Sequence, residues 1–188
     1  MAIQSDIKPF AEHLFEQMNA INYRFSNDND WWKNLSAKCK QNRDYVHQMS
    51  MNVSTPLNYY AVFHHLKELI PSDAIIVSEG ANTMDIGRSM LLNTLPRHRL
   101  DAGTFGTMGV GPGFAIAAAL YCRDRFPGKR VICVEGDSAF GFSGMEIETM
   151  VRYNLPITIV IVNNNGIYGG FDLETFEAIR QAGDLTQV

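Results

Sequence analysis

The sequence predicts an α/β fold, a parallel sheet with helices on both faces, preceded by a helical segment. Three observations predict it. Short apolar runs alternate with helical segments from residue 74 onward, these runs show no polar alternation, and the residues before them have helical periodicity. Apolar runs without alternation are typical of parallel strands buried on both faces. Strands that alternate with helices imply right-handed crossover connections.

The helical segment occupies residues 1–54. Apolar residues recur at three- and four-residue intervals between Ile7 and Ile21, which predicts an amphipathic helix. The stretch from Trp31 to Met49 predicts a second helix. Thr55-Pro56 is a helix start signal, because a capping hydroxyl precedes a proline at the first helical position. We therefore place a domain boundary here and assign residues 55–188 to the α/β domain.

The α/β domain is expected to contain four strands. They are expected at Ala74–Ser78, Arg99–Ala102, Arg130–Glu135 and Ile157–Asn163, with helices between them at Asn82–Asn93, Gly111–Cys122 and Gly144–Tyr153. Ligands of such sheets bind beyond the carboxyl ends of the strands, so the site is expected at that edge.

Composition excludes several classes of function. The net charge of −4 argues against a nucleic-acid partner, because no basic face is evident. The cysteines Cys39, Cys122 and Cys133 are odd in number and widely spaced, which predicts neither a disulfide framework nor a zinc site. No apolar run is long enough to cross a membrane, and we find no targeting signal.

Oxygen-bearing residues follow two of the predicted strands. Asp137 ends the run that begins at Val131, and Asn164 ends the run that begins at Ile157. One crossover joins the two strands, so both side chains are expected to face one small volume. With a backbone carbonyl they form an oxygen set suited to Mg²⁺, which usually takes its remaining ligands from phosphate and water. Each segment alone is better explained as an ordinary strand-end turn, but the pair, in strand-helix-strand order at this spacing, favours a metal site.

This pair of segments resembles the metal and diphosphate motif of the thiamine diphosphate enzymes. Gly136-Asp137-Ser138 followed by Asn163-Asn164 carries the resemblance. The family usually has glycine in place of Ser138. The serine, with the run from Glu135 to Glu146, is similar to the acyl-CoA members, the 2-hydroxyacyl-CoA lyases and the oxalyl-CoA decarboxylases.

The resemblance implies thiamine diphosphate and Mg²⁺ as cofactors. The implied metal ligands are Asp137, the side chain of Asn164 and the backbone oxygen of Gly166. The backbone N–H groups near Ser138 and Ala139 are expected to receive a phosphate.

A second match is the run from Asp101 to Gly111. In the family such a loop holds the aminopyrimidine ring, so Gly106 is expected to accept a hydrogen bond through its carbonyl. Met108 is expected to lie beneath the bent cofactor. The alternative is a glycine-rich turn before a helix. The spacing Gly109-x-Gly111-x-Gly113 is not a dinucleotide fingerprint.

Two further residues are weaker candidates for contact with the cofactor. Asn82 follows the first strand of the domain and is expected to contact diphosphate or substrate, although helix capping explains it nearly as well. Tyr168 extends the metal loop and is expected near the phosphates, although its ring could equally serve packing.

The resemblance also implies a reaction, cleavage of a 2-hydroxyacyl-CoA to an aldehyde and formyl-CoA through carbanion chemistry on the cofactor. The alternatives are oxalyl-CoA decarboxylation and a non-catalytic subunit that keeps the fold. In the family, the activating glutamate lies in a separate N-terminal domain, so no residue here is assigned that role. Glu135, Glu146 and Glu148 are expected to form salt bridges or caps.

The resemblance also implies a longer chain, an assembly, a substrate and a cellular location. We expect a fragment of a longer chain, inactive by itself, with exposed apolar interface surface and a pyrimidine-binding domain as its partner. A homo-oligomer is expected, with an acyl-CoA substrate. The location is expected to be peroxisomal in a eukaryote and cytoplasmic in a bacterium, although the final Leu-Thr-Gln-Val is not a peroxisomal address.

Overall fold

A computed structural model describes residues 2–183 of the chain. The final Leu-Thr-Gln-Val, which bears on the expected location, lies outside the described residues. The chain divides into two compact units, Met1–Val46 and His47–Val188. No helix within the described part is long and apolar enough to cross a membrane.

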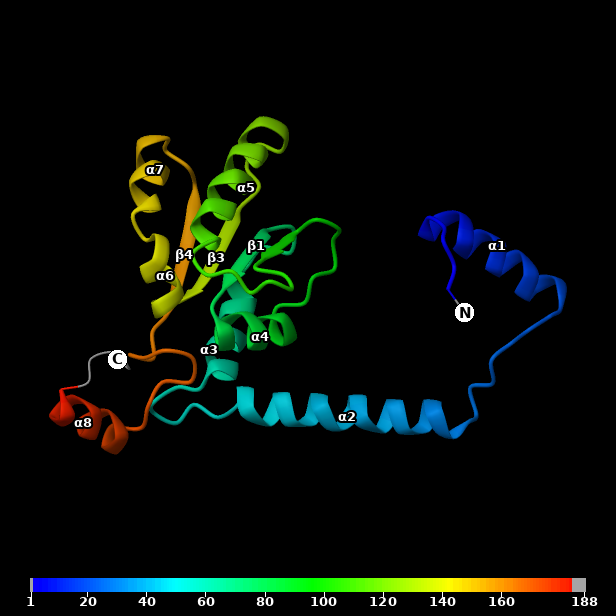
Figure 1. Cartoon of the computed structure of the whole chain (residues 1–188), viewed down its shortest axis with the longest axis horizontal. Coiled ribbons are helices and arrows are strands. Elements are labelled where there is room, and N and C mark those ends of the chain that lie inside the picture. The colour runs from blue at the N-terminus through cyan, green and yellow to red at the C-terminus, as the bar shows by residue number, and fades with distance from the viewer. Residues whose placement is uncertain (1, 184–188) are drawn as a thin grey trace. The chain divides into compact units, whose positions relative to one another are not determined.

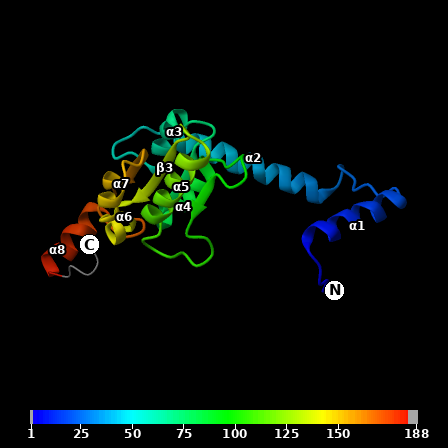
Figure 2. The ribbon, with the colours of Figure 1, turned by 90° about the horizontal axis from the view of Figure 1, so that it is seen from above.

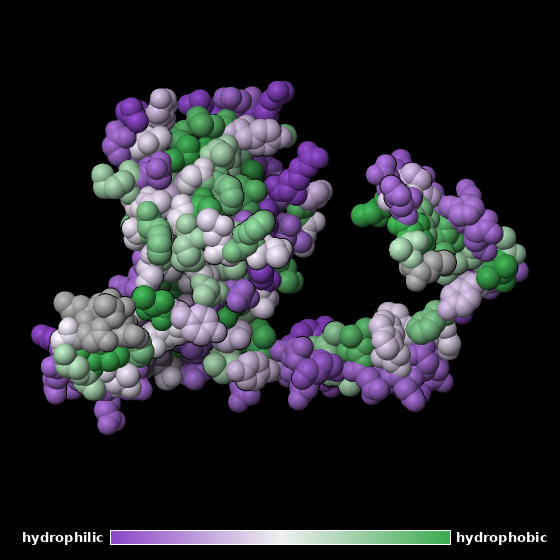
Figure 3. All heavy atoms as spheres, in the orientation of Figure 1, coloured by the Kyte–Doolittle hydropathy of each residue, from purple (hydrophilic) through white to green (hydrophobic). Residues whose placement is uncertain are grey.

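The first unit is helical, as predicted. It contains α1 (Ile7–Ala20) and most of α2 (Asp30–Ser50). α1 has no buried residue, and Ile7 is 86% exposed. Hydrophobic side chains are visible on the surface of α1 in Figure 3. Apolar side chains are therefore exposed on α1, whereas an interface with a partner domain and self-association stay predictions.

The second unit has the predicted α/β fold, shown in Figure 1 and Figure 2. All four strands are parallel, in the order β2-β1-β3-β4. The elements are α3 (Tyr59–Leu69), β1 (Ile75–Glu79), α4 (Ala81–Met90), β2 (Arg99–Asp101), α5 (Gly111–Arg125), β3 (Val131–Gly136), α6 (Asp137–Ser143), α7 (Glu146–Arg152), β4 (Ile157–Val162) and α8 (Leu173–Ala182).

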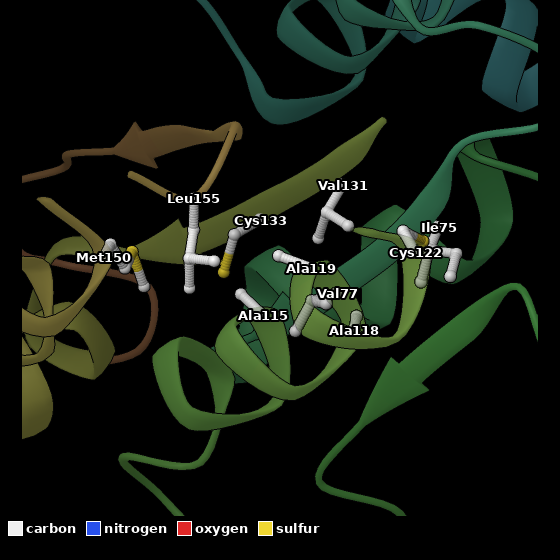
Figure 4. Packing of buried hydrophobic residues seen from close by; sticks show 10 residues of the cluster. All are labelled: Ile75, Val77, Ala115, Ala118, Ala119, Cys122, Val131, Cys133, Met150 and Leu155. Atoms are coloured by element: carbon white, nitrogen blue, oxygen red, sulfur yellow. The ribbon is translucent and has the colours of Figure 1, made fainter. Parts of the chain in front are cut away.

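The core lies between α5 and the two central strands, β1 and β3. Alternate residues of a strand point to opposite faces, so the odd-numbered residues of both strands point toward α5. The core comprises Ile75, Val77, Ala115, Ala118, Ala119, Cys122, Val131, Cys133, Met150 and Leu155 (Figure 4). α4 also contacts β1 and β3 and packs against α3, where the ring of Phe63 is fully buried.

The third helix starts later than predicted. Thr55-Pro56 lies before the helix, and Asn58 is the N-cap: its side-chain oxygen accepts the Ala61 N–H at 3.0 Å. Asn58 also donates through Nδ2 to the Met49 carbonyl at 3.0 Å, which anchors the cap to the preceding segment. A better-anchored cap three residues later therefore sets the start of α3.

Two other predictions about the sheet are wrong in part. β4 is not buried on both faces, because it is the last strand of the sheet and Ile161 is 43% exposed. The single helix expected at Gly144–Tyr153 is α7, and the separate short helix α6 precedes it. α6 begins at Asp137, so the predicted metal ligand is the first residue of a helix.

Candidate functional site

A cavity of about 470 Å³ lies at the carboxyl ends of β1, β3 and β4. Eight of the predicted site residues line it: Asn82, Met108, Asp137, Ser138, Ala139, Asn164, Gly166 and Tyr168. Tyr59, Gly80, Thr83 and Phe142 are further lining residues for which no role was predicted. The structure thus gathers residues from five separate segments around one volume.

The predicted metal ligands lie at neighbouring strand ends. β3 and β4 pair through Gly136 and Val162, so Asp137 and the loop after β4 begin at the same edge of the sheet. Ser138 Oγ donates to the Gly166 carbonyl at 3.3 Å, which joins the two segments directly.

The chemistry of these donors fits Mg²⁺ with a phosphate ligand. A carboxylate, an amide oxygen and a backbone carbonyl are all hard oxygen donors. Among residues 2–183 no group of three or more histidine, cysteine, aspartate or glutamate side chains could hold a metal ion. Asp137 is the only acidic side chain that lines the cavity, so a bound Mg²⁺ would keep positive charge that a diphosphate could neutralise.

The loop after β4 is folded tightly. A Cβ on Gly166 would lie 2.9 Å from the Cα of Gly170, so a side chain at this position would force the loop apart. The Tyr168 carbonyl accepts from Asn164 Nδ2 at 3.1 Å and from Asn82 Nδ2 at 3.5 Å. The loop is therefore braced internally through Asn164 and joined to α4 through Asn82.

The structure excludes the alternative roles that the sequence left open for Asn82 and Tyr168, helix capping and packing respectively. Asn82 is not the N-cap of α4, because Gly80 takes that position and the Asn82 amide reaches Tyr168 instead. Tyr168 is 68% exposed, so its ring is not buried in packing. Direct contact of either residue with a cofactor stays a prediction.

The loop between β2 and α5 forms another wall of the cavity. Met108 lines the cavity and is 39% exposed, whereas Gly106 does not contribute to the lining. The loop's outer surface is open, and Phe105 is 97% exposed. The expected hydrogen bond from the Gly106 carbonyl to a pyrimidine ring stays a prediction.

A buried glutamate anchors the end of this loop. The Glu79 carboxylate accepts the backbone N–H of Gly109 and, at 2.6 Å, that of Gly111. A Cβ on Gly111 would collide with Glu135 Oε1 and lie 2.7 Å from Glu79 Oε2, so only glycine fits between the two carboxylates. Sequence reasoning assigned Glu79 no role, although a carboxylate that ends a buried strand must find a partner.

Glu135 lies beside Glu79 on the adjacent strand. Burial raises the pKa of Glu135 to about 7, and the charge of Glu79 adds to the rise, while a hydrogen bond from Cys133 Sγ at 3.0 Å opposes it. Its Oε2 has no hydrogen-bond partner in the described part of the chain. The expected salt bridge or cap at Glu135 is therefore wrong, whereas Glu148 does pair with Arg152 at 3.2 Å.

Comparison with known proteins identifies the same region. Residues 79–175 match the family described as "Thiamine pyrophosphate enzyme, C-terminal TPP binding domain". The chain is 61% identical to mouse 2-hydroxyacyl-CoA lyase 1 over 92% of this chain and 30% of the relative. It is 46% identical to the oxalyl-CoA decarboxylase of Escherichia coli K12 over 74% of this chain and 24% of the relative.

Solved structures support the fold. A putative thiamin diphosphate-dependent enzyme from Mycobacterium smegmatis superposes with a TM-score of 0.56 and 29% identity, over 66% of this chain and 25% of that one. The chain spans about a third or less of the length of these relatives.

Proposed function

The chain belongs to the thiamine pyrophosphate enzymes through their C-terminal cofactor-binding domain, and on this basis we propose that its cavity binds thiamine diphosphate and Mg²⁺. The observation that carries the proposal is the convergence of Asp137, Asn164 and Gly166 on one cavity. The Asp137 carboxylate, Asn164 Oδ1 and the Gly166 carbonyl would hold the metal. The backbone N–H groups of Ser138 and Ala139, in the first turn of α6, would donate to the diphosphate.

We propose that the whole protein is a carbon–carbon lyase that converts a 2-hydroxyacyl-CoA to a shortened aldehyde and formyl-CoA. When bound, thiamine diphosphate would supply the nucleophilic carbon and the electron sink that cleavage of a carbon–carbon bond requires. The role of this chain is to position that group. Met108 would support the ring from the loop, and Glu79 would fix the loop through two backbone N–H groups.

The identity to the mouse lyase, which exceeds the identity to the bacterial decarboxylase, favours the lyase reaction. Oxalyl-CoA decarboxylation, which would release CO₂ and formyl-CoA, is the second candidate. A non-catalytic subunit is the third, since the activating glutamate is proposed to come from a domain outside this sequence.

The remaining proposals concern the assembly. Residues 1–54 would be the end of a central domain and a linker, and residues 55–188 the cofactor-binding domain. The exposed apolar surface would face a pyrimidine-binding domain within a homo-oligomer, and the protein would be peroxisomal in a eukaryote or cytoplasmic in a bacterium.

The test is to supply the full-length protein with a 2-hydroxyacyl-CoA and, separately, with oxalyl-CoA, in the presence of thiamine diphosphate and Mg²⁺. The lyase predicts an aldehyde and formyl-CoA from the first substrate. Formyl-CoA and CO₂ from the second substrate alone would establish the decarboxylase. Cofactor binding without any product from either substrate would favour the non-catalytic subunit.

A further inference from the structure

Tyr59 lies at the metal site although it is far from the metal ligands in the sequence. It is the first residue of α3, and Asn58 immediately before it caps the helix. Its hydroxyl accepts a hydrogen bond from Asn164 Nδ2 at 3.0 Å across 105 positions of the chain. The same side chain lines the cavity, so the capped start of α3 delivers a phenol to the site.

The partners of Asn164 fix which way its amide points. The Tyr168 carbonyl can only accept a hydrogen bond and takes one from Nδ2 at 3.1 Å, whereas the Gly166 N–H can only donate and gives one to Oδ1 at 3.2 Å. With Tyr59 as the second acceptor for Nδ2, both N–H protons of the amide are used. Oδ1 retains a lone pair for a metal ion.

The hydroxyl of Tyr59 is suited to this task. A phenol has two lone pairs and one proton, so it accepts from Asn164 while its own proton remains available to the cavity.

We propose that Tyr59 is a positioning residue for the metal site, which holds the Asn164 amide so that Oδ1 points toward Mg²⁺. The inference rests on the proposed function, because it assumes that Asn164 is a metal ligand. Partners that orient a metal ligand act on metal affinity, whereas a residue that only fills space acts on stability. This difference makes the proposal testable.

The experiment compares the wild type with Tyr59→Phe, which removes one oxygen and keeps the ring. The Mg²⁺ concentration needed for half-maximal thiamine diphosphate binding is measured by calorimetry, and the melting temperature is measured without cofactor. The expected result is a ~10- to 100-fold rise in the Mg²⁺ requirement, with an unchanged melting temperature. Tyr121→Phe is the matched control, because Tyr121 is half exposed on α5 beside Phe126 and lines no part of the cavity.

A second variant keeps the test decisive. In an Asn164→Ser background, adding Tyr59→Phe is expected to cause no further rise, because a residue that acts through Asn164 loses its effect with it. Equal effects of Tyr59→Phe in both backgrounds, or an unchanged Mg²⁺ requirement, would overturn the inference. Asp137→Ala in the same series distinguishes failure of the inference about Tyr59 from failure of the proposed cofactor site. If Asp137→Ala also leaves Mg²⁺-dependent binding intact, the proposed cofactor site itself is wrong.

Discussion

Two walls of the cavity are held in place by different means. The proposed metal ligands Asp137, Asn164 and Gly166 form one wall, called the metal wall. It follows directly from β3 and β4, which hydrogen-bond along their length. The loop proposed to hold the cofactor ring, residues 102–110 and called the ring loop, follows the short strand β2 and is largely exposed. The sheet therefore preforms the metal wall, whereas the ring loop depends on polar anchors at its two ends.

The ring loop's anchors are both carboxylates. Asp101 precedes the loop and pairs with Arg88 on α4, and Glu79 on β1 accepts two backbone N–H groups where the loop enters α5. Loss of an anchor should loosen the loop and leave the metal wall intact.

Glu79→Ala should have the largest effect on the ring loop. It leaves two backbone N–H groups without their charged acceptor, which should lower the free energy of unfolding by ~3 kcal/mol. Chemical denaturation measures the loss, and hydrogen exchange should quicken at residues 102–111 more than in β4. Glu148→Ala is the control, since its exposed pair with Arg152 should contribute less than ~0.5 kcal/mol. Equal losses in the two variants would contradict the anchor.

Gly111→Ala tests the junction between the loop and the two buried carboxylates. The added methyl group collides with Glu135 Oε1, so the free energy of unfolding should fall by ~2 kcal/mol. Gly113→Ala, two residues along the same helix, meets nothing within 4 Å and should be neutral or stabilising by ~0.5 kcal/mol. If thermal melts show the two variants to be equally stable, the space at Gly111 is not restricted.

The other anchor, Asp101, should stabilise the fold in a pH-dependent way. Hydrogen bonds from Arg88 hold the pKa of Asp101 below its usual value, and the Gly103 N–H at 2.9 Å adds to this. The unfolded chain binds this proton more readily, so the contribution is complete above the unfolded pKa and is lost as pH falls through the folded pKa. Wild type should exceed Asp101→Asn by ~1 kcal/mol at neutral pH, and the difference should shrink below about pH 4. A pH-independent difference between their denaturation curves would exclude the charge as its source.

Alanine variants of two apolar residues in the ring loop should have similar stabilities but different affinities for the cofactor. Phe105 is open to solvent and Met108 lines the cavity, so replacing either with alanine should change the free energy of unfolding by less than ~1 kcal/mol. Met108→Ala should weaken thiamine diphosphate binding by about tenfold, equivalent to ~1.4 kcal/mol, while Phe105→Ala should not. Equal binding by both variants in a cofactor titration would remove Met108 from the site.

The convergence of Asp137 and Asn164 on one cavity could be predicted from the sequence because its signals are local. A buried strand that ends in small oxygen-bearing residues is visible in one segment, and the crossover rule brings Asp137 and Asn164 to one edge. The exposure of β4 could not be predicted, because it depends on the position of the strand at the edge of the sheet. The later start of α3 was missed because Asn58 competes with Thr55 as a cap and is anchored by a contact outside the helix.

The hydrogen bonds between side chains and distant segments of the fold could not be predicted from the sequence. Tyr59 reads as one aromatic residue at a helix start, and nothing near it indicates a contact with Asn164. Glu79 could be recognised as a carboxylate at the end of a buried strand, but its acceptance of two loop N–H groups depends on where α5 begins. Such contacts follow from packing between distant segments.

Titration of thiamine diphosphate into the purified protein is the decisive test of whether the cavity binds the cofactor through Mg²⁺. The titration is run with Mg²⁺, with EDTA, and with Mg²⁺ on Asp137→Ala. The proposed site predicts binding to the wild type with Mg²⁺ and its loss under the other two conditions. Binding that persists in EDTA or in Asp137→Ala, or its absence from the folded wild type with Mg²⁺, would contradict the assignment of this cavity.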